Sequence, residues 1–270
     1  MLTRVQQLKQ VYILQRIDES KIRTSQIGLA ETERLAKISW NVNPTLWQSN
    51  TKDAIKVISL NCAGLKAHCK DIETDSMVIA GDIIHLIETS LLEGENSPLV
   101  LPGYACHLTS VAQGKGIATY YTASKFKHDT DYKTMNMQIT KFSSESVDVL
   151  NVYRSSKGNS GELLAKLVEM ITRHKPILIT GDFNICFMNH SRNRISKGLL
   201  EEHNIQQLME EPTHILGGHI DHVYWRDAQK IWMDPVIERY SPYYSDHDAS
   251  CITLKKVNDK EPESTMLEDQ

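Results

Sequence analysis

Two oxygen-bearing side chains, Asp182 and Asn184, follow a short apolar run in the second half of the chain. The run at 177–180 comes directly after Pro176 and has the composition of a buried strand. Gly181 permits a sharp exit from that strand, and residues two apart on extended backbone point to the same side. The sequence therefore predicts a carboxylate and a carboxamide held together at the mouth of a sheet.

Other predicted strands end in the same manner. Apolar runs at 55–60, 82–87 and 147–152, and two later ones, are each followed by a polar side chain able to bind metal or phosphate. One such end is unremarkable because loops are polar, but six in succession predict a single cleft along one edge of a layered β structure. These ends carry Asn61, Glu88, Tyr153, Asp182 with Asn184, Asp221, and Asp246 with His247.

The composition of this set favours one kind of chemistry. Asn, Asp and Glu supply oxygen donors, and the set contains no paired Cys or cluster of several His, so the hard cations Mg²⁺ or Mn²⁺ are the expected ligands. A cation held by few carboxylates keeps positions open for phosphate oxygens. A His beside an Asp can donate or carry a proton at a phosphate. We therefore expect phosphoester hydrolysis.

Helical periodicity places the connecting elements. A helix is expected after the first strand through about residue 79, a second helix with Ser160 as its N-cap, and a third over 197–209. Strands at 104–110 and 116–122 are expected to form a hairpin around a tight Gly-containing turn.

Six short motifs, in this order, carry a family resemblance: LNCAGL, IHLIET, NVYR, ITGDFN, HIDHVY and YSDHD. Together they resemble the endonuclease/exonuclease/phosphatase superfamily over about residues 55–254. The resemblance implies an α/β fold, a four-layer sandwich of two face-to-face β-sheets with helices outside, as in DNase I. It also implies Mg²⁺-dependent cleavage of phosphodiester or phosphomonoester bonds.

The resemblance also implies a role for each matching residue. Glu88 would be the principal metal ligand, supported by Asn61 and Asp246. Asp182 would position or deprotonate the attacking water, and Asn184 would hold the scissile phosphate.

The remaining motif residues would act on the phosphate. Tyr153 would donate to a phosphate oxygen, and His247, oriented by Asp221, would stabilise the charge of the transition state. Two departures from abasic-site enzymes occur, Ala63 in place of an Asp and Ser156 in place of an Asn. They weaken an abasic-repair assignment and leave the nuclease chemistry intact.

Composition is that of an ordinary soluble protein, with 40% apolar and 24% charged residues in 270. No run is long enough to span a membrane, and the N-terminus lacks the apolar core of a signal peptide. The five cysteines form no CxxC pair, which favours a reducing compartment. We expect an intracellular protein, nuclear if it acts on DNA. A Gly-rich phosphate loop is absent, and no small-molecule cofactor is expected.

The net charge of −4 is unevenly distributed. Residues 257–270 hold one Lys and five acids, which is −4, so residues 1–256 sum to zero. One basic set comprises Lys115, Lys125, Lys127, Lys133 and Lys141, and a second comprises Arg154, Lys157, Arg192, Arg194 and Lys197. Either set could be a solvated surface or could attract a phosphate backbone. We assign Arg154, Lys157, Arg192 and Arg194 to substrate binding, with DNA as the partner.

The chain is expected to have three parts: a helical leader at 1–53, the main domain at 54–256, and a disordered acidic tail at 257–270. Two leader segments, LTRVQQLKQVYIL and ESKIRTSQIGLAETERL, resemble the C-terminal end of helicases of Helitron-like transposons. Some of these helicases are fused to an endonuclease of the same superfamily. An ordinary amphipathic leader is the alternative.

The function that fits best is a Mg²⁺-dependent DNA endonuclease of transposable-element origin. A phosphomonoesterase or phospholipid phosphatase on the same fold is one alternative, and a non-catalytic nucleic-acid-binding remnant is another. Three residues with two possible roles are interpreted separately. His85, within an apolar strand, is expected in the core, whereas Trp225 and Trp232 could either stack on bases or pack in the interior.

Overall fold

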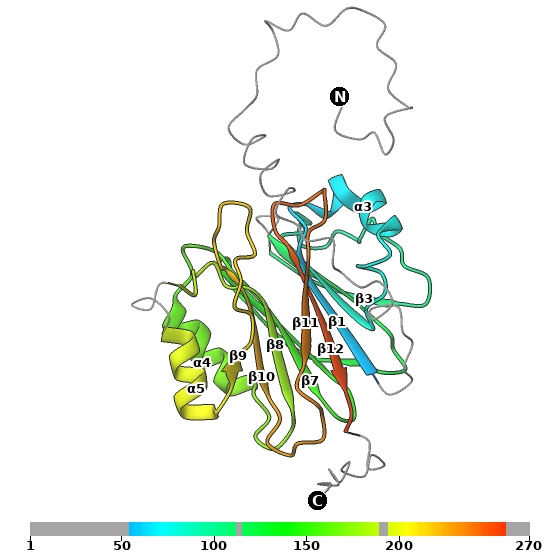
Figure 1. Cartoon of the computed structure of the whole chain (residues 1–270). Helices are drawn as coiled ribbons and strands as arrows, with labels where there is room; N and C mark the ends of the chain where they lie inside the picture. The colour runs from blue at the N-terminus through cyan, green and yellow to red at the C-terminus, as the bar shows by residue number, and fades with distance from the viewer. Residues whose placement is uncertain (1–53, 112–114, 189–193, 258–270) are drawn as a thin grey trace, which may run out of the picture. The chain divides into compact units, whose positions relative to one another are not determined.

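The computed structural model describes residues 54–111, 115–188 and 194–257. The predicted leader at 1–53, Arg192 and the tail beyond Val257 lie outside these residues. Within the described part of the chain, two six-stranded β-sheets pack face to face, and helices cover their outer faces (Figure 1). This is the α/β sandwich that the motifs predict.

The first sheet combines the N-terminal and C-terminal strands of the domain. Its order is β11 (Val236–Tyr240), β12 (Ala249–Lys255), β1 (Ala54–Asn61), β2 (Ile83–Ile87), β4 (Gly116–Tyr121) and β3 (Ala105–Ser110). β1 and β2 are parallel, so both end at the same edge of the sheet, with Asn61 opposite Ile87.

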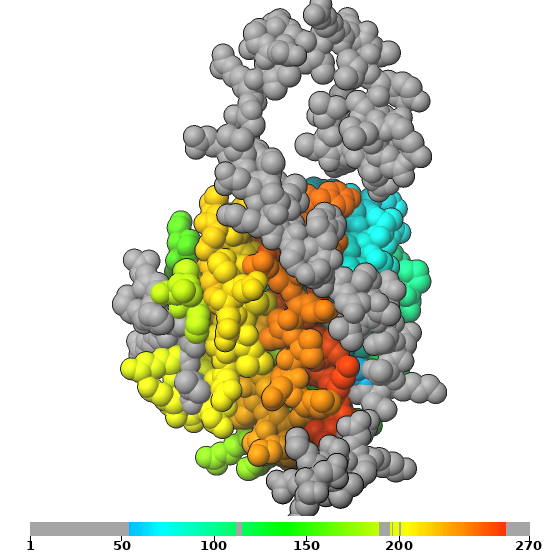
Figure 2. Space-filling model, in the orientation of Figure 1, coloured from blue at the N-terminus to red at the C-terminus, as the bar shows by residue number. Residues whose placement is uncertain are grey.

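The second sheet comes from the middle of the chain. Its order is β5 (Lys127–Lys133), β6 (Met137–Ser143), β7 (Asp148–Arg154), β8 (Ile177–Asp182), β10 (Asp221–Arg226) and β9 (Gln206–Gln207). β7 and β8 are parallel and again end together, with Tyr153 opposite Asp182. The C-terminal part of the described chain, coloured yellow to red, makes up the middle of the face shown in Figure 2.

The helices bury apolar stripes against the outer faces. α3 (Leu65–Thr74) packs on the first sheet through Leu65 and Ile72. α4 (Ser160–Met170) and α5 (Arg194–His203) pack on the second sheet. α3 and α5 are shorter than predicted. The N-cap of α4 is Asn159, not Ser160, and its side chain accepts hydrogen bonds from the backbone N–H groups of Gly161 and Glu162.

Period-two alternation explains why the site forms between the sheets. On β1 the odd-numbered residues Ile55 and Val57 face the second sheet, and Asn61 continues the same face at the strand end. On β8, Leu178 faces the first sheet and Asp182 continues that face. The polar residues at these strand ends therefore converge at the mouth of the inter-sheet core.

The three side chains that the sequence analysis interpreted separately, those of His85, Trp225 and Trp232, lie in the interior. His85 is fully buried, as predicted, and burial lowers its pKa to about 3, so the ring is neutral. Trp225 and Trp232 both pack in the inter-sheet core. Base stacking by these two tryptophans is therefore excluded in this conformation.

β5 is a strand that the sequence did not predict. Its sequence, KHDTDYK, lacks aliphatic residues, and most of the strand is exposed at the edge of the second sheet. Pairing with β6 therefore determines its conformation more than its own composition does. No helix in the described ranges is long and apolar enough to cross a membrane.

Gly181 is required at the end of β8, and this yields a first prediction. Its φ is 137°, and a Cβ added there would lie 2.0 Å from the carbonyl oxygen of Val152. Gly181→Ala should therefore lower the free energy of unfolding by more than about 3 kcal/mol, since backbone strain adds to a clash with a neighbouring strand.

Gly103→Ala is the matched control for this substitution. Gly103 also has a positive φ, 86°, but a Cβ there would meet nothing within 4 Å. Gly103→Ala should lower the free energy of unfolding by about 1 kcal/mol, which is the cost of the backbone conformation alone. Urea denaturation of both variants would distinguish the cost of backbone strain from the cost of the steric clash. Equal losses of unfolding free energy would contradict the close approach of Gly181 to Val152.

Candidate active site

A buried carboxylate, that of Asp182, is the centre of the polar network at the mouth of the sandwich. Asn61 Nδ2 donates to Asp182 Oδ2 at 3.0 Å, which links β1 of one sheet with β8 of the other. Asn184 donates twice to the same carboxylate, from its backbone N at 2.8 Å and from Nδ2 at 3.0 Å. Asp182 is only 1% exposed, so these donors replace the water that a carboxylate requires.

A His–Asp pair adjoins this carboxylate. Asp221 lies opposite Asp182 in the antiparallel register of β8 and β10, and its Oδ2 is 2.9 Å from His247 Nδ1. The other ring nitrogen, Nε2, lies 3.4 Å from Asn61 Nδ2. The structure thus joins five predicted residues from four separate motifs in one network: Asn61, Asp182, Asn184, Asp221 and His247.

The close packing of these groups raises the pKa values of Asp182 and His247. Burial, together with the neighbouring Asp221, raises the pKa of Asp182 to about 8, although His247 and the donors from Asn184 and Asn61 oppose the shift. Burial alone would lower the pKa of His247, but the hydrogen bond and charge of Asp221 outweigh it and raise that pKa to about 9. The raised pKa makes the Asp182 carboxylate a stronger base than an ordinary aspartate, and the imidazole of His247 favours its charged form.

Glu88 and Tyr153 lie beside this network and are joined by Lys115. Lys115 Nζ donates to Glu88 Oε1 at 2.8 Å and lies 5.7 Å from the centroid of the Tyr153 ring. Tyr153 is buried, and burial together with the Glu88 carboxylate raises its pKa well above the usual range. The phenol therefore remains protonated and can act as a hydrogen-bond donor.

The backbone adopts an uncommon conformation at three of these strand ends. Ala63, Glu88 and Asn184 have φ values of 48°, 53° and 49°, in the left-handed region. Such a conformation costs about 1–3 kcal/mol in a residue other than Gly, so it persists where the surrounding structure imposes it. Each of the three turns redirects the chain directly after a strand that carries a site residue.

The residues predicted to bind a metal have the donor chemistry for a hard divalent cation. Glu88 already holds one cation, the Lys115 ammonium, and its side chain remains 27% exposed. Asn61 ends the strand next to that of Glu88. Asp246, 53% exposed, lies 3.6 Å from His214 Nε2 and directly precedes His247. Oxygen donors of this kind fit Mg²⁺.

Arg154 has a different role from the predicted one. Its side chain is buried, and its guanidinium donates to the backbone carbonyls of Phe183, Asn184 and Gly158. It therefore positions the loop that carries Asn184 instead of facing substrate. Alternation along β7 explains this, because Tyr153 faces the cleft and the next residue must point to the opposite face.

The other predicted basic contacts are only partly described. Lys157 is exposed in the turn after β7, Arg194 begins α5, and substrate binding by either stays a prediction. Most lysines of the first basic set form ion pairs with acids. The pairs are Lys115–Glu88, Lys125–Asp82, Lys133–Glu93, and Lys141 with Asp129 and Asp148.

Two hydroxyl groups that the sequence analysis did not single out hold the His–Asp pair. Thr213 Oγ1 donates to Asp221 Oδ2 at 2.6 Å. Ser245 Oγ donates to the carbonyl of Asn61 at 2.6 Å and accepts from the backbone N of His247 at 3.0 Å. Ser245 lies within the YSDHD motif, but nothing in the sequence connects Thr213 with Asp221. Lys115 was likewise assigned only to a basic stretch.

The sequence profile of the Endonuclease/Exonuclease/phosphatase family matches residues 58–247, a range that includes every strand-end residue of this network. The chain belongs to this family. Its members catalyse hydrolysis of phosphoester bonds, so the family supports the predicted reaction class. No curated protein sequence matches the chain significantly.

Solved structures show the same endonuclease/exonuclease/phosphatase fold at low identity. The human Nocturnin catalytic domain is 15% identical with a TM-score of 0.55, and the match covers 76% of this chain and 95% of that domain. The endonuclease domain of TRAS1, a telomere-specific non-LTR retrotransposon, is 13% identical with a TM-score of 0.55, covering 75% and 99%. The 3′ phosphatase NExo from Neisseria is 16% identical with a TM-score of 0.53, covering 76% and 100%.

Proposed function

We propose that this chain is a Mg²⁺-dependent endonuclease that hydrolyses phosphodiester bonds in DNA. The observation that carries the proposal is the buried group of Asn61, Asp182, Asp221 and His247, with Tyr153 near both Asp182 and Glu88. This arrangement places a base (Asp182), a cationic donor (His247) and a carboxylate able to bind a metal ion (Glu88) at the same end of the sandwich. A non-catalytic remnant would have no need to keep all three together.

Each residue of the network supports one part of the reaction. Asp182, whose pKa is raised by burial and by Asp221, can take a proton from the attacking water when it is ionised, and Asn184 on the same turn can orient the phosphate. The imidazolium of His247 and the phenol of Tyr153 can donate where negative charge accumulates. A Mg²⁺ ion held by Glu88, Asn61 and Asp246 would neutralise charge on the phosphate oxygens.

The names of two proteins with the same fold favour DNA as the substrate. TRAS1 is named as an endonuclease of a retrotransposon, and the NExo structure holds a product DNA hairpin. The transposable-element origin rests on the leader sequence, outside the described residues, together with this likeness. The NExo name also favours a second candidate, removal of a 3′ phosphate from DNA, because a phosphomonoester needs the same groups.

Incubation with supercoiled plasmid is the direct test. We expect conversion of supercoiled plasmid to the nicked form in Mg²⁺ and no conversion in EDTA, measured on an agarose gel. Asp182→Asn serves as the matched control for contaminating nuclease, since it keeps the size of the side chain. A DNA hairpin with a 3′ phosphate and vesicles containing a phosphoinositide test the two phosphatase alternatives. Phosphate release from either without nicking would overturn the endonuclease proposal.

A further inference from the structure

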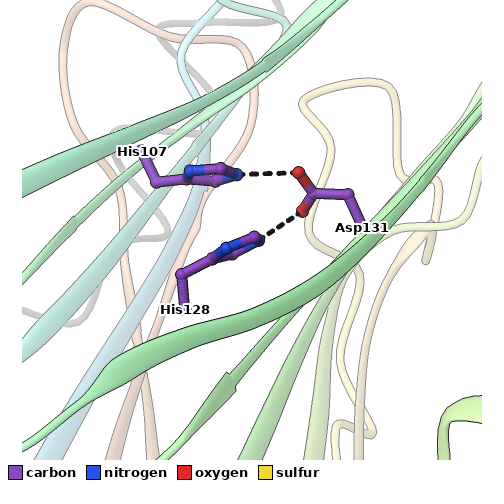
Figure 3. A group of neighbouring side chains, drawn as sticks. All are labelled: His107, His128 and Asp131. Atoms are coloured by element: carbon purple, nitrogen blue, oxygen red, sulfur yellow. Dashed lines mark hydrogen bonds and ion pairs between the residues drawn. The ribbon is translucent and has the colours of Figure 1, made fainter.

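A second group of metal-binding side chains lies away from the candidate active site. It consists of His107 on β3 and of His128 and Asp131 on β5. His107 Nε2 lies 2.8 Å from Asp131 Oδ2, and His128 Nε2 lies 3.0 Å from Asp131 Oδ1 (Figure 3). All three side chains point toward one another, and they come from the edge strands of the two sheets.

A β-bulge creates this arrangement. Residues three apart on a regular strand point to opposite faces, which would separate His128 from Asp131. The register between β5 and β6 shifts between His128 and Thr130, because Asp129 is an extra residue opposite the partner strand. The bulge therefore brings His128 and Asp131 to the same face, where both meet His107.

The surroundings hold the two imidazoles in place and leave their ends accessible. The rings stack with centroids 3.7 Å apart, and both make T-shaped contacts with Phe142, a residue of the inter-sheet core. The three side chains are each about one quarter exposed: 26% for His107, 29% for His128 and 24% for Asp131. The group is therefore partly open to solvent, from which a small cation could approach it.

Asp131 is an anion at any physiological pH. Burial alone would raise its pKa, but hydrogen bonds with His107, His128 and Thr140 outweigh burial and lower that pKa to about 2.

We propose that His107, His128 and Asp131 bind a borderline divalent cation of the Zn²⁺ class, in a site separate from the oxygen-rich candidate active site. Two imidazole nitrogens, one carboxylate oxygen and a water are a common tetrahedral set for Zn²⁺. Bonds of about 2.0–2.1 Å require donor atoms roughly 3.3 Å apart. The candidate donor atoms already lie within 4.8 Å of one another, so small side-chain rotations would bring them to one cation. Each ring would bind through an unprotonated Nε2 and carry its proton on Nδ1, so the cation would replace the present hydrogen bonds to Asp131.

The position of the site suggests what the cation would do. β3 and β5 are the edge strands of different sheets, and each is hydrogen-bonded to its own sheet on one side. A cation held by both strands would join the two sheets across their shared edge. Because the site needs both strands in place, it exists only in the folded protein, and binding of the cation should raise the free energy of unfolding.

Zn²⁺ alone is the probe for the test, added to the full chain in excess Mg²⁺ so that hard-oxygen sites are occupied. We expect binding of one Zn²⁺ that depends on this cluster, measured by calorimetry. The melting temperature should rise by about 5–10 °C at a Zn²⁺ concentration about one hundred times the Kd. In imidazole NMR spectra, the Nε2 signals of His107 and His128 should shift.

His107→Gln, His128→Gln and Asp131→Asn test the individual ligands. Gln retains an N–H donor near the position of Nε2, so the hydrogen bond and the fold can persist while a ligand is lost. Each variant should bind this Zn²⁺ at least about 10–100-fold more weakly, since even outer partners of a metal site have effects of that size.

His68→Gln is the matched control. His68 also faces a carboxylate, that of Asp71 at 3.4 Å, and has a similar exposure of 23%. This variant should bind Zn²⁺ as the unmodified chain does. An affinity within threefold of the unmodified chain in any of the three cluster variants, or a Zn²⁺ effect no larger than that of Mg²⁺, would overturn the proposal. The cluster would then serve only to join β3 and β5 by hydrogen bonds.

Discussion

Replacing Glu88 by Gln is expected to abolish Mg²⁺-dependent hydrolysis while leaving the fold intact. Removal of one preorganised electrostatic group costs about 10²–10³-fold in rate, and loss of the principal carboxylate ligand should cost at least that much. Stability should change by less than about 1 kcal/mol, because the partly exposed pair with Lys115 contributes little. Initial rates of plasmid nicking and a urea denaturation curve measure the two effects.

Glu93→Gln is the matched control for Glu88→Gln. Glu93 lies in the same loop and also pairs with a lysine, Lys133, at 2.7 Å, but its side chain is 60% exposed. Breaking that pair removes a Glu–Lys contact without touching the network, so activity should be retained. Undiminished nicking by Glu88→Gln, or its collapse into unfolded protein, would show that Glu88 is not a metal ligand.

The strand ends of the site were predictable because two elementary rules act on them. Parallel strands end at one edge of a sheet, and alternation sets the face of each side chain. Asn61 and Glu88 follow neighbouring parallel strands, and Asp182 and Asn184 follow a third. Applying alternation to Arg154 as well would have placed it on the opposite face from Tyr153, away from the cleft.

Contacts between distant and weakly patterned segments were not predictable. β5 lacks a run of apolar residues, so its pairing with β6 and its bulge depend on the tertiary structure. His107 and Asp131 are 24 residues apart and lie on different sheets. The hydrogen bond between Thr213 and Asp221 likewise requires a loop conformation that no local pattern specifies.

His247→Ala should reduce the rate of hydrolysis by about 10²–10³-fold, the contribution of one donor aimed at the developing charge. DNA affinity should change little, because one donor at the reacting phosphate would make only a small part of the contacts with a phosphate backbone. Asp221→Asn should also lower the rate, since the amide cannot support the charged ring as the carboxylate does. Thr213→Val, which leaves the carboxylate in place, should have a smaller effect than either.

The double variant distinguishes a coupled pair from two independent groups. Asp221 contacts His247 through Nδ1 at 2.9 Å, and both side chains are only 8% exposed, so the carboxylate acts on the phosphate through the imidazole. Once His247 is absent, Asp221 has no ring to orient. The double variant should therefore be scarcely slower than His247→Ala alone. A rate lowered by the product of the two single effects would mean that Asp221 acts independently of His247, for example through its charge interaction with Asp182. The assigned pairing would then be wrong.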